Sequence, residues 1–135
     1  MAHLIVEMSD TVARSIDSDG LCGALHEGMV ETGIFPLAGI RVRAYRAEAF
    51  AMADKHPDNG FVALTLSVGH GRTKADLAAA GEIIFAAAKQ HLHDWLGGQY
   101  FGLSLEIREI DPDLSWIVNT MRPRLLAELG PEGNI

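Results

Sequence analysis

The 135-residue chain contains a single cysteine, Cys22, so no disulfide can form within it. Proteins without disulfides are typical of a reducing compartment, and we therefore expect a cytoplasmic protein. Positive charge is also scarce, because 11 Lys and Arg stand against 18 Asp and Glu, for a formal net charge of −7. Nucleic acids and anionic membranes are bound by clustered basic residues, so neither is an expected partner.

No uncharged apolar run is long enough to suggest a membrane span. The longest apolar-looking stretch, residues 78–85, contains Glu82 and has the spacing of a helix. The chain starts without a basic segment and reaches Glu7 and Asp10 early, so we expect no secretory signal peptide.

The histidines also lack the spacing of a metal site. They are His3, His26, His56, His70, His91 and His93. Only His91 and His93 are close in sequence, and two residues that far apart lie on different faces of a helix. We therefore expect no metal and interpret the histidines as structural or surface residues. Cys22 lies beside a helical stripe and is expected in the core rather than as a nucleophile.

Apolar residues make up 48% of the chain, enough for one folded domain that spans residues 1–135. Residues 3–8 alternate between apolar and mixed positions, which predicts a strand that starts at the first or second residue. A chain start held in a strand is unusual, because termini are normally loose. Its amine, with an ordinary pKa of about 7.7–8.0, is suited to act as a base near neutral pH. An ordinary first strand is the simpler interpretation.

The rest of the first half predicts a helix and a second strand. A turn-rich segment, 11–20, precedes a helical stripe at 21–29, and Gly33 is a plausible helix stop. Pro36 favours an extended connector at 34–39. The strand that follows, 40–45, places Arg41 and Arg43 on one face. They form a local positive site, although arginines on a strand more often mark a solvated face.

The second half repeats this order. Residues 47–59 connect the halves, and 61–68 alternate as a third strand. After the turn 69–72, Thr73 is a good helix cap, and an amphipathic stripe runs over 77–95 to a stop at 97–98. Residues 103–108 alternate as a fourth strand. Beyond residue 111 we expect a short helix within 114–129 and a frayed tail at 131–135.

This order predicts an α+β fold of two β-α-β units, about 1–58 and 59–110, with a C-terminal extension, 111–135. A crossover helix makes the strands of each unit parallel. The units are expected to form a four-stranded sheet with both helices on one face. Valine and isoleucine positions on the other face would need cover, so we expect a homo-oligomer.

The turn Gly69-His70-Gly71-Arg72 is the strongest local candidate for a binding site. It joins a strand to a helix N-terminus, where backbone amides and the helix dipole favour an anion, and Arg72 adds a planar donor for a carboxylate or phosphate. The glycine pattern alone is a weak signal. It lacks the length and the Lys-Ser/Thr ending of a P-loop, which argues against nucleotide binding.

Four segments together resemble 5-carboxymethyl-2-hydroxymuconate isomerase, a family of the tautomerase superfamily. They are the opening residues 3–10, the run Thr32-Gly33-Ile34-Phe35-Pro36-Leu37-Ala38-Gly39-Ile40-Arg41-Val42-Arg43, the later residues 52–54 and the turn 69–72. The resemblance implies a homotrimeric tautomerase-like fold, no cofactor, no metal and a role in aromatic catabolism. The implied reaction converts a dienol acid with several carboxylates into its conjugated keto isomer.

The resemblance also implies the site. In the family an N-terminal proline, exposed when the initiator methionine is removed, shuttles the proton, and arginines that match Arg41 and Arg72 bind and polarise the substrate. We expect the catalytic set Ala2, Arg41 and Arg72, with Arg43, His3 and Gly71 in substrate binding.

The chain departs from the family at the decisive position, because Ala2 replaces the proline. A proline amine is aimed by its ring, whereas an alanine amine rotates but already has a pKa near neutrality. If Met1 stays, Ala2 contributes only an amide nitrogen. The Met1 amine would then lie about 3.3–3.6 Å further along, too far to serve without rearrangement. The alternatives to an isomerase are a trimeric binder of small carboxylates without turnover, and an interaction module without a small ligand.

Overall fold

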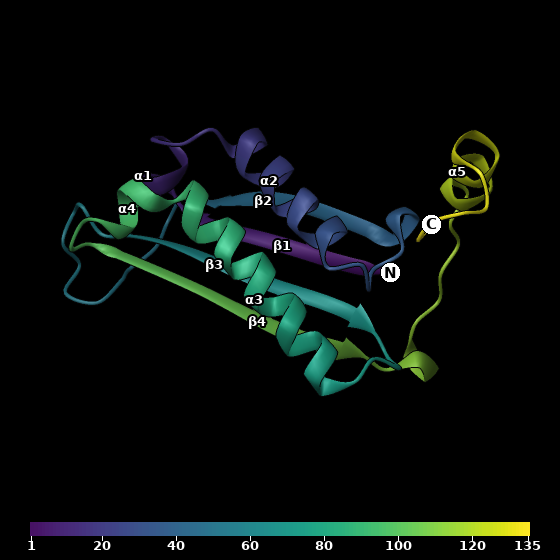
Figure 1. Ribbon diagram of the computed structural model, residues 1–135. Coiled ribbons are helices and arrows are strands. Elements are labelled where there is room, and N and C mark those ends of the chain that lie inside the picture. Colours follow the sequence, from purple (N-terminus) through teal and green to yellow (C-terminus); the bar gives the residue numbers. More distant parts are fainter.

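A computed structural model describes all 135 residues and shows one mixed four-stranded sheet with two helices on one face (Figure 1). The strands are β1 (Ala2–Ser9), β2 (Ile40–Ala47), β3 (Gly60–Gly69) and β4 (Phe101–Ile110), in the order β2-β1-β3-β4. The pairs β1–β2 and β3–β4 are parallel, and β1 and β3 are antiparallel. The predicted α+β architecture of two β-α-β units is therefore confirmed.

The helices α2 (Ser18–Glu31) and α3 (Lys74–His91) lie side by side across the sheet (Figure 1). The predicted stripe of α2 is confirmed, because Leu21, Leu25 and Met29 are all buried. Gly28 lets the two helices approach, since a Cβ placed there would lie 3.3 Å from the Cβ of Ala87. The segment predicted to be only turn-rich contains a further short helix, α1 (Asp10–Ala13).

The predicted cap of α3 is confirmed, because the Thr73 hydroxyl accepts a hydrogen bond from the backbone N–H of Asp76 at 3.1 Å. The helix is shorter than its apolar stripe predicted. It is interrupted at Leu92, which has φ −102° and ψ 19°, and α4 (His93–Leu96) follows. Trp95 still packs inward, because its Nε1 donates to Ser15 Oγ at 2.9 Å and its ring lies 5.5 Å from that of Phe101.

The core lies between the sheet and these helices. Alternate strand residues face it, and Leu4, Val6, Leu66 and Val68 are fully buried there. The opposite face differs from the prediction of a valine and isoleucine surface. Its strand positions carry Ile5 and, at the end of β4, Ile110, but no valine; the others are mainly small or polar, with Tyr45 and Phe61.

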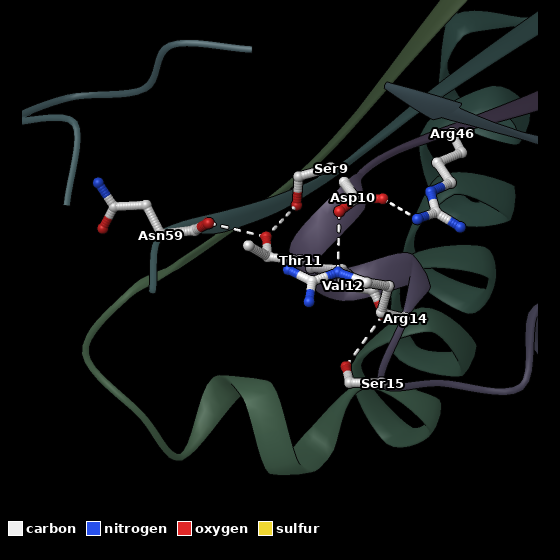
Figure 2. Close-up of polar contacts among 8 residues, drawn as sticks. All are labelled: Ser9, Asp10, Thr11, Val12, Arg14, Ser15, Arg46 and Asn59. Carbon is white, nitrogen blue, oxygen red and sulfur yellow. Dashed lines mark hydrogen bonds and ion pairs between the residues drawn. The ribbon is translucent and has the colours of Figure 1, made fainter. Parts of the chain in front are cut away.

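Side-chain hydrogen bonds and ion pairs hold the end of β1 that lies away from the N-terminus. The Ser9 and Thr11 hydroxyls lie 2.8 Å apart, and Thr11 donates to the backbone carbonyl of Asn59 at 2.8 Å (Figure 2). Asp10 forms ion pairs with Arg14 and Arg46. These contacts fix the start of β3 to the end of β1, so the register of the central strand pair is set at this end.

The C-terminal extension was predicted only in part. It contains η2 (Pro112–Leu114), an extended segment and the helix α5 (Met121–Leu129), which begins later than the predicted range of 114–129. The expectation of a frayed tail is wrong. Ile135 is only 9% exposed, and the Asn134 backbone carbonyl accepts a hydrogen bond from Leu37 N–H at 2.8 Å. The tail therefore returns to the sheet near the N-terminus (Figure 1).

None of the helices combines the length and the apolar composition that crossing a membrane requires.

Candidate functional site

The chain start lies inside the sheet, between two strands. Ala2 pairs with Ile40 of β2 and with Val68 of β3, and it is only 2% exposed. Partial burial lowers the pKa of the Met1 amine below its ordinary value, and the positive charges of Arg72 and then Arg41 lower it further. The first residue therefore lies among the arginines that the sequence pointed to, and not in open solvent. The Met1 amine itself, expected to lie too far along the chain, is within the field of both arginines.

Arg41 and Arg43 lie on the open face of the sheet, beside His3. The parallel register pairs His3 with Arg41, and Arg43 Nη1 lies 3.1 Å from His3 Nδ1. Because arginine can only donate, the imidazole accepts at Nδ1. Burial is the main cause that lowers the pKa of His3, followed by the charges of Arg43, Arg41 and the N-terminal amine. A neutral His3 therefore orients Arg43, whose Nε also donates to the Tyr45 hydroxyl at 3.2 Å.

Arg72 is held by backbone carbonyls and by an aromatic ring. Its Nε donates to Ile34 O at 3.0 Å, its Nη1 donates to Gly69 O at 3.3 Å, and its guanidinium carbon lies 5.0 Å from the centroid of the buried Phe35 ring. Arg41 is held in a similar way, because its Nη1 donates to Ala38 O at 3.1 Å. Both side chains are thus positioned by the connector that joins α2 to β2.

The three arginines at this end of the sheet have no carboxylate partner. Arg41, Arg43 and Arg72 form no ion pair, whereas the ion-paired arginines lie elsewhere: Arg14, Arg46, Arg108 and Arg124. The chain has a net charge of −7 and offers many carboxylates. The positive charge of these three guanidinium groups, which no carboxylate neutralises, therefore contrasts with the negative charge of the chain as a whole. Such a cluster attracts anions, and the planar guanidinium group matches a carboxylate.

Gly71 contributes through its backbone. It has φ +118°, a conformation that side chains other than glycine rarely adopt, and it is exposed. This conformation turns the chain from β3 toward Arg72. The neighbouring His70 is directed to β4, where its Nδ1 lies 3.1 Å from Glu109 Oε2. The structure thus brings five of the six expected residues to the same end of the sheet. Strand pairing and a side-chain contact join His3 to Arg41 and Arg43, and the charges of Arg41 and Arg72 act on the amine that precedes Ala2. Gly71 shapes the turn beside them.

Residues that sequence reasoning missed also shape the site. Tyr45 lies two residues beyond Arg43 on the same strand face, so the alternation of β2 was a usable signal. The Phe35 ring packs under the Arg72 guanidinium group, but the position of Phe35 before Pro36 indicated only an extended backbone. Asn119 donates from Nδ2 to Ala38 O at 2.9 Å, the same carbonyl that Arg41 uses. No sequence signal could connect these residues, which are 81 positions apart.

The chain contains no group of three or more His, Cys, Asp or Glu side chains placed to hold a metal ion. Cys22 is half-buried, and burial together with the charge of Asp19 raises the pKa of its thiol. A raised thiol pKa makes it a poor nucleophile, but it lies at the edge of the core and not within the buried core where it was predicted.

A cleft of about 710 Å³ lies at the opposite end of the sheet from Met1. Its lining includes Arg14, Asp58, His91, Trp95 and Tyr100, and it contains none of the expected site residues. The arginines and the chain-start amine therefore lie outside this cleft, at the other end of the sheet.

Comparison with known proteins gives a family for this arrangement. The family model described as 5-carboxymethyl-2-hydroxymuconate isomerase matches residues 2–125. The 5-carboxymethyl-2-hydroxymuconate Delta-isomerase of Escherichia coli is 37% identical over 121 residues, which cover 90% of this chain and 96% of that protein. A crystal structure of a 5-carboxymethyl-2-hydroxymuconate isomerase from Deinococcus radiodurans R1 has a TM-score of 0.85 at 31% identity, covering 91% of this chain and 92% of its own.

More distant structures share the fold alone. A fused 4-OT protein, described as a symmetric trimer, has a TM-score of 0.55 at 20% identity and covers 88% of this chain and 96% of its own. The α+β sheet, with Arg41 and Arg72 near its chain start, has the tautomerase fold, and the family model and the Escherichia coli relative define an isomerase. The chain belongs to the 5-carboxymethyl-2-hydroxymuconate isomerase family.

Proposed function

We propose that the chain, acting as one domain over residues 1–135, isomerises an unsaturated 2-hydroxy acid with several carboxylates, of the 5-carboxymethyl-2-hydroxymuconate type, in aromatic catabolism, without a cofactor. One observation carries the proposal: the chain start, where the pKa of the Met1 amine is lowered, lies in the field of Arg41 and Arg72, which have no carboxylate partner in the chain. Proton transfer on an anionic substrate requires a base to move the proton and positive groups to stabilise the negative charge, and the amine and the guanidinium groups can supply both.

In the proposed reaction the proton of the enol hydroxyl is removed and a proton is delivered to the far carbon of the diene. The O–H bond breaks, a C–H bond forms, and the remaining double bond shifts into conjugation with the new carbonyl. The N-terminal amine carries the proton. Arg41 and Arg72 bind a carboxylate and the enol oxygen, where negative charge grows in the dienolate, and Arg43, oriented by His3, holds a second carboxylate. Gly71 shapes the turn that presents Arg72.

The proposed base is the amine of Ala2, exposed by removal of Met1. Ala2 begins β1 and is almost fully buried while Met1 is present, and any burial that remains once Met1 is removed favours the neutral, basic form of its amine. The β1 pairings with β2 and β3 fix its backbone, which replaces part of the orientation that a proline ring would supply. The alternative function, binding of small carboxylates without turnover, is favoured if Met1 remains, because Ala2 N is then an amide without basicity.

We also propose that the working protein is a homotrimer. The fused 4-OT relative of the same fold is a symmetric trimer. In the single chain the arginine cluster is only half-buried, and the sheet face beside it carries the half-buried Ile5 and Phe61 and the exposed Tyr45. Neighbouring copies packed on this face would cover these side chains and give the site walls that exclude water.

The test combines intact mass with turnover. Protein purified from its native cell is weighed to determine whether Met1 is present, and ketonisation of the dienol acid is followed by ultraviolet absorbance. We expect a mass that lacks Met1, and turnover that is lost when the amine is acetylated and retained in an Ala2→Pro variant. Retained Met1 without turnover, together with binding of the substrate, would establish the carboxylate binder instead.

A further inference from the structure

The connector 33–39 is the element that both candidate catalytic arginines depend on. Ile34 O accepts from Arg72 Nε, Phe35 lies under the Arg72 guanidinium, and Ala38 O accepts from Arg41 Nη1. Apart from the short 3-10 helix Leu37–Gly39, this segment has no regular structure of its own. Its conformation must therefore be fixed by contacts with other parts of the chain.

The C-terminal segment supplies these contacts at three points. Asn119 Nδ2 donates to Ala38 O at 2.9 Å, Leu37 N–H donates to Asn134 O at 2.8 Å, and Asn134 Nδ2 donates to Gly33 O at 2.9 Å. Asn119 is itself oriented by α5, because its Oδ1 accepts from Met121 N–H at 3.0 Å. The buried Ile135 anchors the end of the tail.

We infer that the segment 119–135 is a clamp that positions Arg41 and Arg72 for the substrate carboxylate, with Asn119 as the positioning residue for Arg41. This inference rests on the proposed function. Ala38 O is shared by two donors, Asn119 Nδ2 and Arg41 Nη1. The Asn119 hydrogen bond holds the carbonyl in place, so that it in turn fixes the guanidinium group. The tail holds the part of the connector that contacts Arg72 in the same way, through its hydrogen bonds with Gly33 and Leu37.

The sharing of one carbonyl makes a specific prediction about coupling. When Asn119 is replaced, Ala38 O loses one of its two donors and the connector gains freedom, so that Arg41 samples orientations that do not match the carboxylate. A neutral hydrogen bond of this kind is typically worth a factor of about 2 to 12 in an equilibrium. The effect of Asn119 on anion binding should therefore require Arg41, whereas a general effect on folding would not.

The test is a double-mutant cycle on full-length protein. Binding of cis,cis-muconate, an unsaturated dicarboxylate, is measured by calorimetry for the wild type, Asn119→Ala, Arg41→Ala and the double variant. Thr120→Ala is the matched control, because this neighbouring residue is exposed and its side chain makes no hydrogen bond to cap α5. Thermal unfolding and sedimentation are recorded for all variants, so that losses of folding or assembly are seen separately.

We expect Asn119→Ala to weaken muconate binding about 2- to 12-fold, Thr120→Ala to leave it unchanged, and Asn119→Ala to have no further effect in the Arg41→Ala background. A chain that ends at Leu129 should show the corresponding coupling with Arg72→Ala. Additive effects of Asn119 and Arg41, or unchanged binding in Asn119→Ala, would overturn the inference while leaving the proposed isomerase intact. A wild type without Met1 that neither binds muconate nor turns over the dienol acid would overturn the proposed function itself, and the clamp with it.

Discussion

Replacing Arg72 by glutamine tests the electrostatic reasoning most directly. Two of the donor groups of Arg72 are used within the chain, by Ile34 O and Gly69 O, and Nη2 makes no hydrogen bond to the protein. The Nη2 end is therefore free for a substrate carboxylate. A hydrogen bond between charged groups contributes about 1.5–3 kcal/mol, so its loss should lower kcat/KM roughly 10- to 150-fold.

The same substitution should change the pH profile. The charge of Arg72 lowers the pKa of the amine at Met1, and we expect it to act in the same direction on an amine at Ala2. Without this charge the amine pKa rises, so more of the amine is protonated and inactive as a base at a given pH. The acid limb of kcat/KM against pH should therefore move to higher pH in Arg72→Gln.

Two further variants separate charge from geometry. Arg72→Lys keeps the charge but loses the planar fork, so kcat/KM should fall by about tenfold while the acid limb stays near its original pH. Arg14→Gln is the control, because Arg14 lies at the opposite end of the sheet, where its exposed side chain pairs with Asp10 at 2.8 Å. The reasoning fails if Arg72→Gln retains kcat/KM within twofold of the control, or if its acid limb does not move.

Three other predictions concern stability. Leu4 is fully buried, so Leu4→Ala should lower the free energy of unfolding in urea by about 2–5 kcal/mol, whereas the exposed Leu129→Ala should change it by less than about 0.5 kcal/mol; equal effects would contradict the described core. Thr73→Ala removes the α3 cap and should cost about 1 kcal/mol in the same assay, and an unchanged midpoint would show that the cap is not needed. The pKa of His3 is lowered by folding, so the unfolded chain binds more protons as the pH falls through the unfolded value of about 6.5. Stability that is present above that pH is lost on acidification; His3→Gln should flatten this dependence in urea titrations at several pH values, and an identical slope in both proteins would contradict the prediction.

The two β-α-β units could be predicted because their signals are local. The alternation of β1 and β3 and the helical stripes of α2 and α3 depend only on residues within each element. The points at which the helices are interrupted were harder to predict. The apolar stripe of α3 continues through Leu92 to Trp95, so periodicity alone gave no sign that the helix ends at His91. The short helix α1 is held by the hydrogen bond from Thr11 to Asn59, which lies in the connection between β2 and β3. A contact over this distance in the chain leaves no local signal.

The site was predictable to the extent that a resemblance and a strand register could place it. Arg41, Arg43 and His3 follow from alternation in neighbouring strands, once the strands are known to be parallel. Arg72 lies near the same end because β3 runs antiparallel to β1, which the order of elements did not determine. The docking of Asn134 on Gly33 spans 101 residues, and a polar glycine-containing tail gives no local indication of such a contact. This is why the tail was expected to be frayed.

The inner position of β1 has a consequence for biosynthesis. Ala2 is held between two strands and its side chain is in the core, so we expect an aminopeptidase, which must draw the Met1-Ala2 bond into its own cleft, to act slowly on the folded protein. On the proposed mechanism, we therefore expect trimming to occur mainly on the nascent chain, before β1 is built into the sheet. Purified protein that still carries Met1 should then stay without its base when it is incubated with a methionine aminopeptidase, and rapid trimming of the folded protein would contradict this expectation.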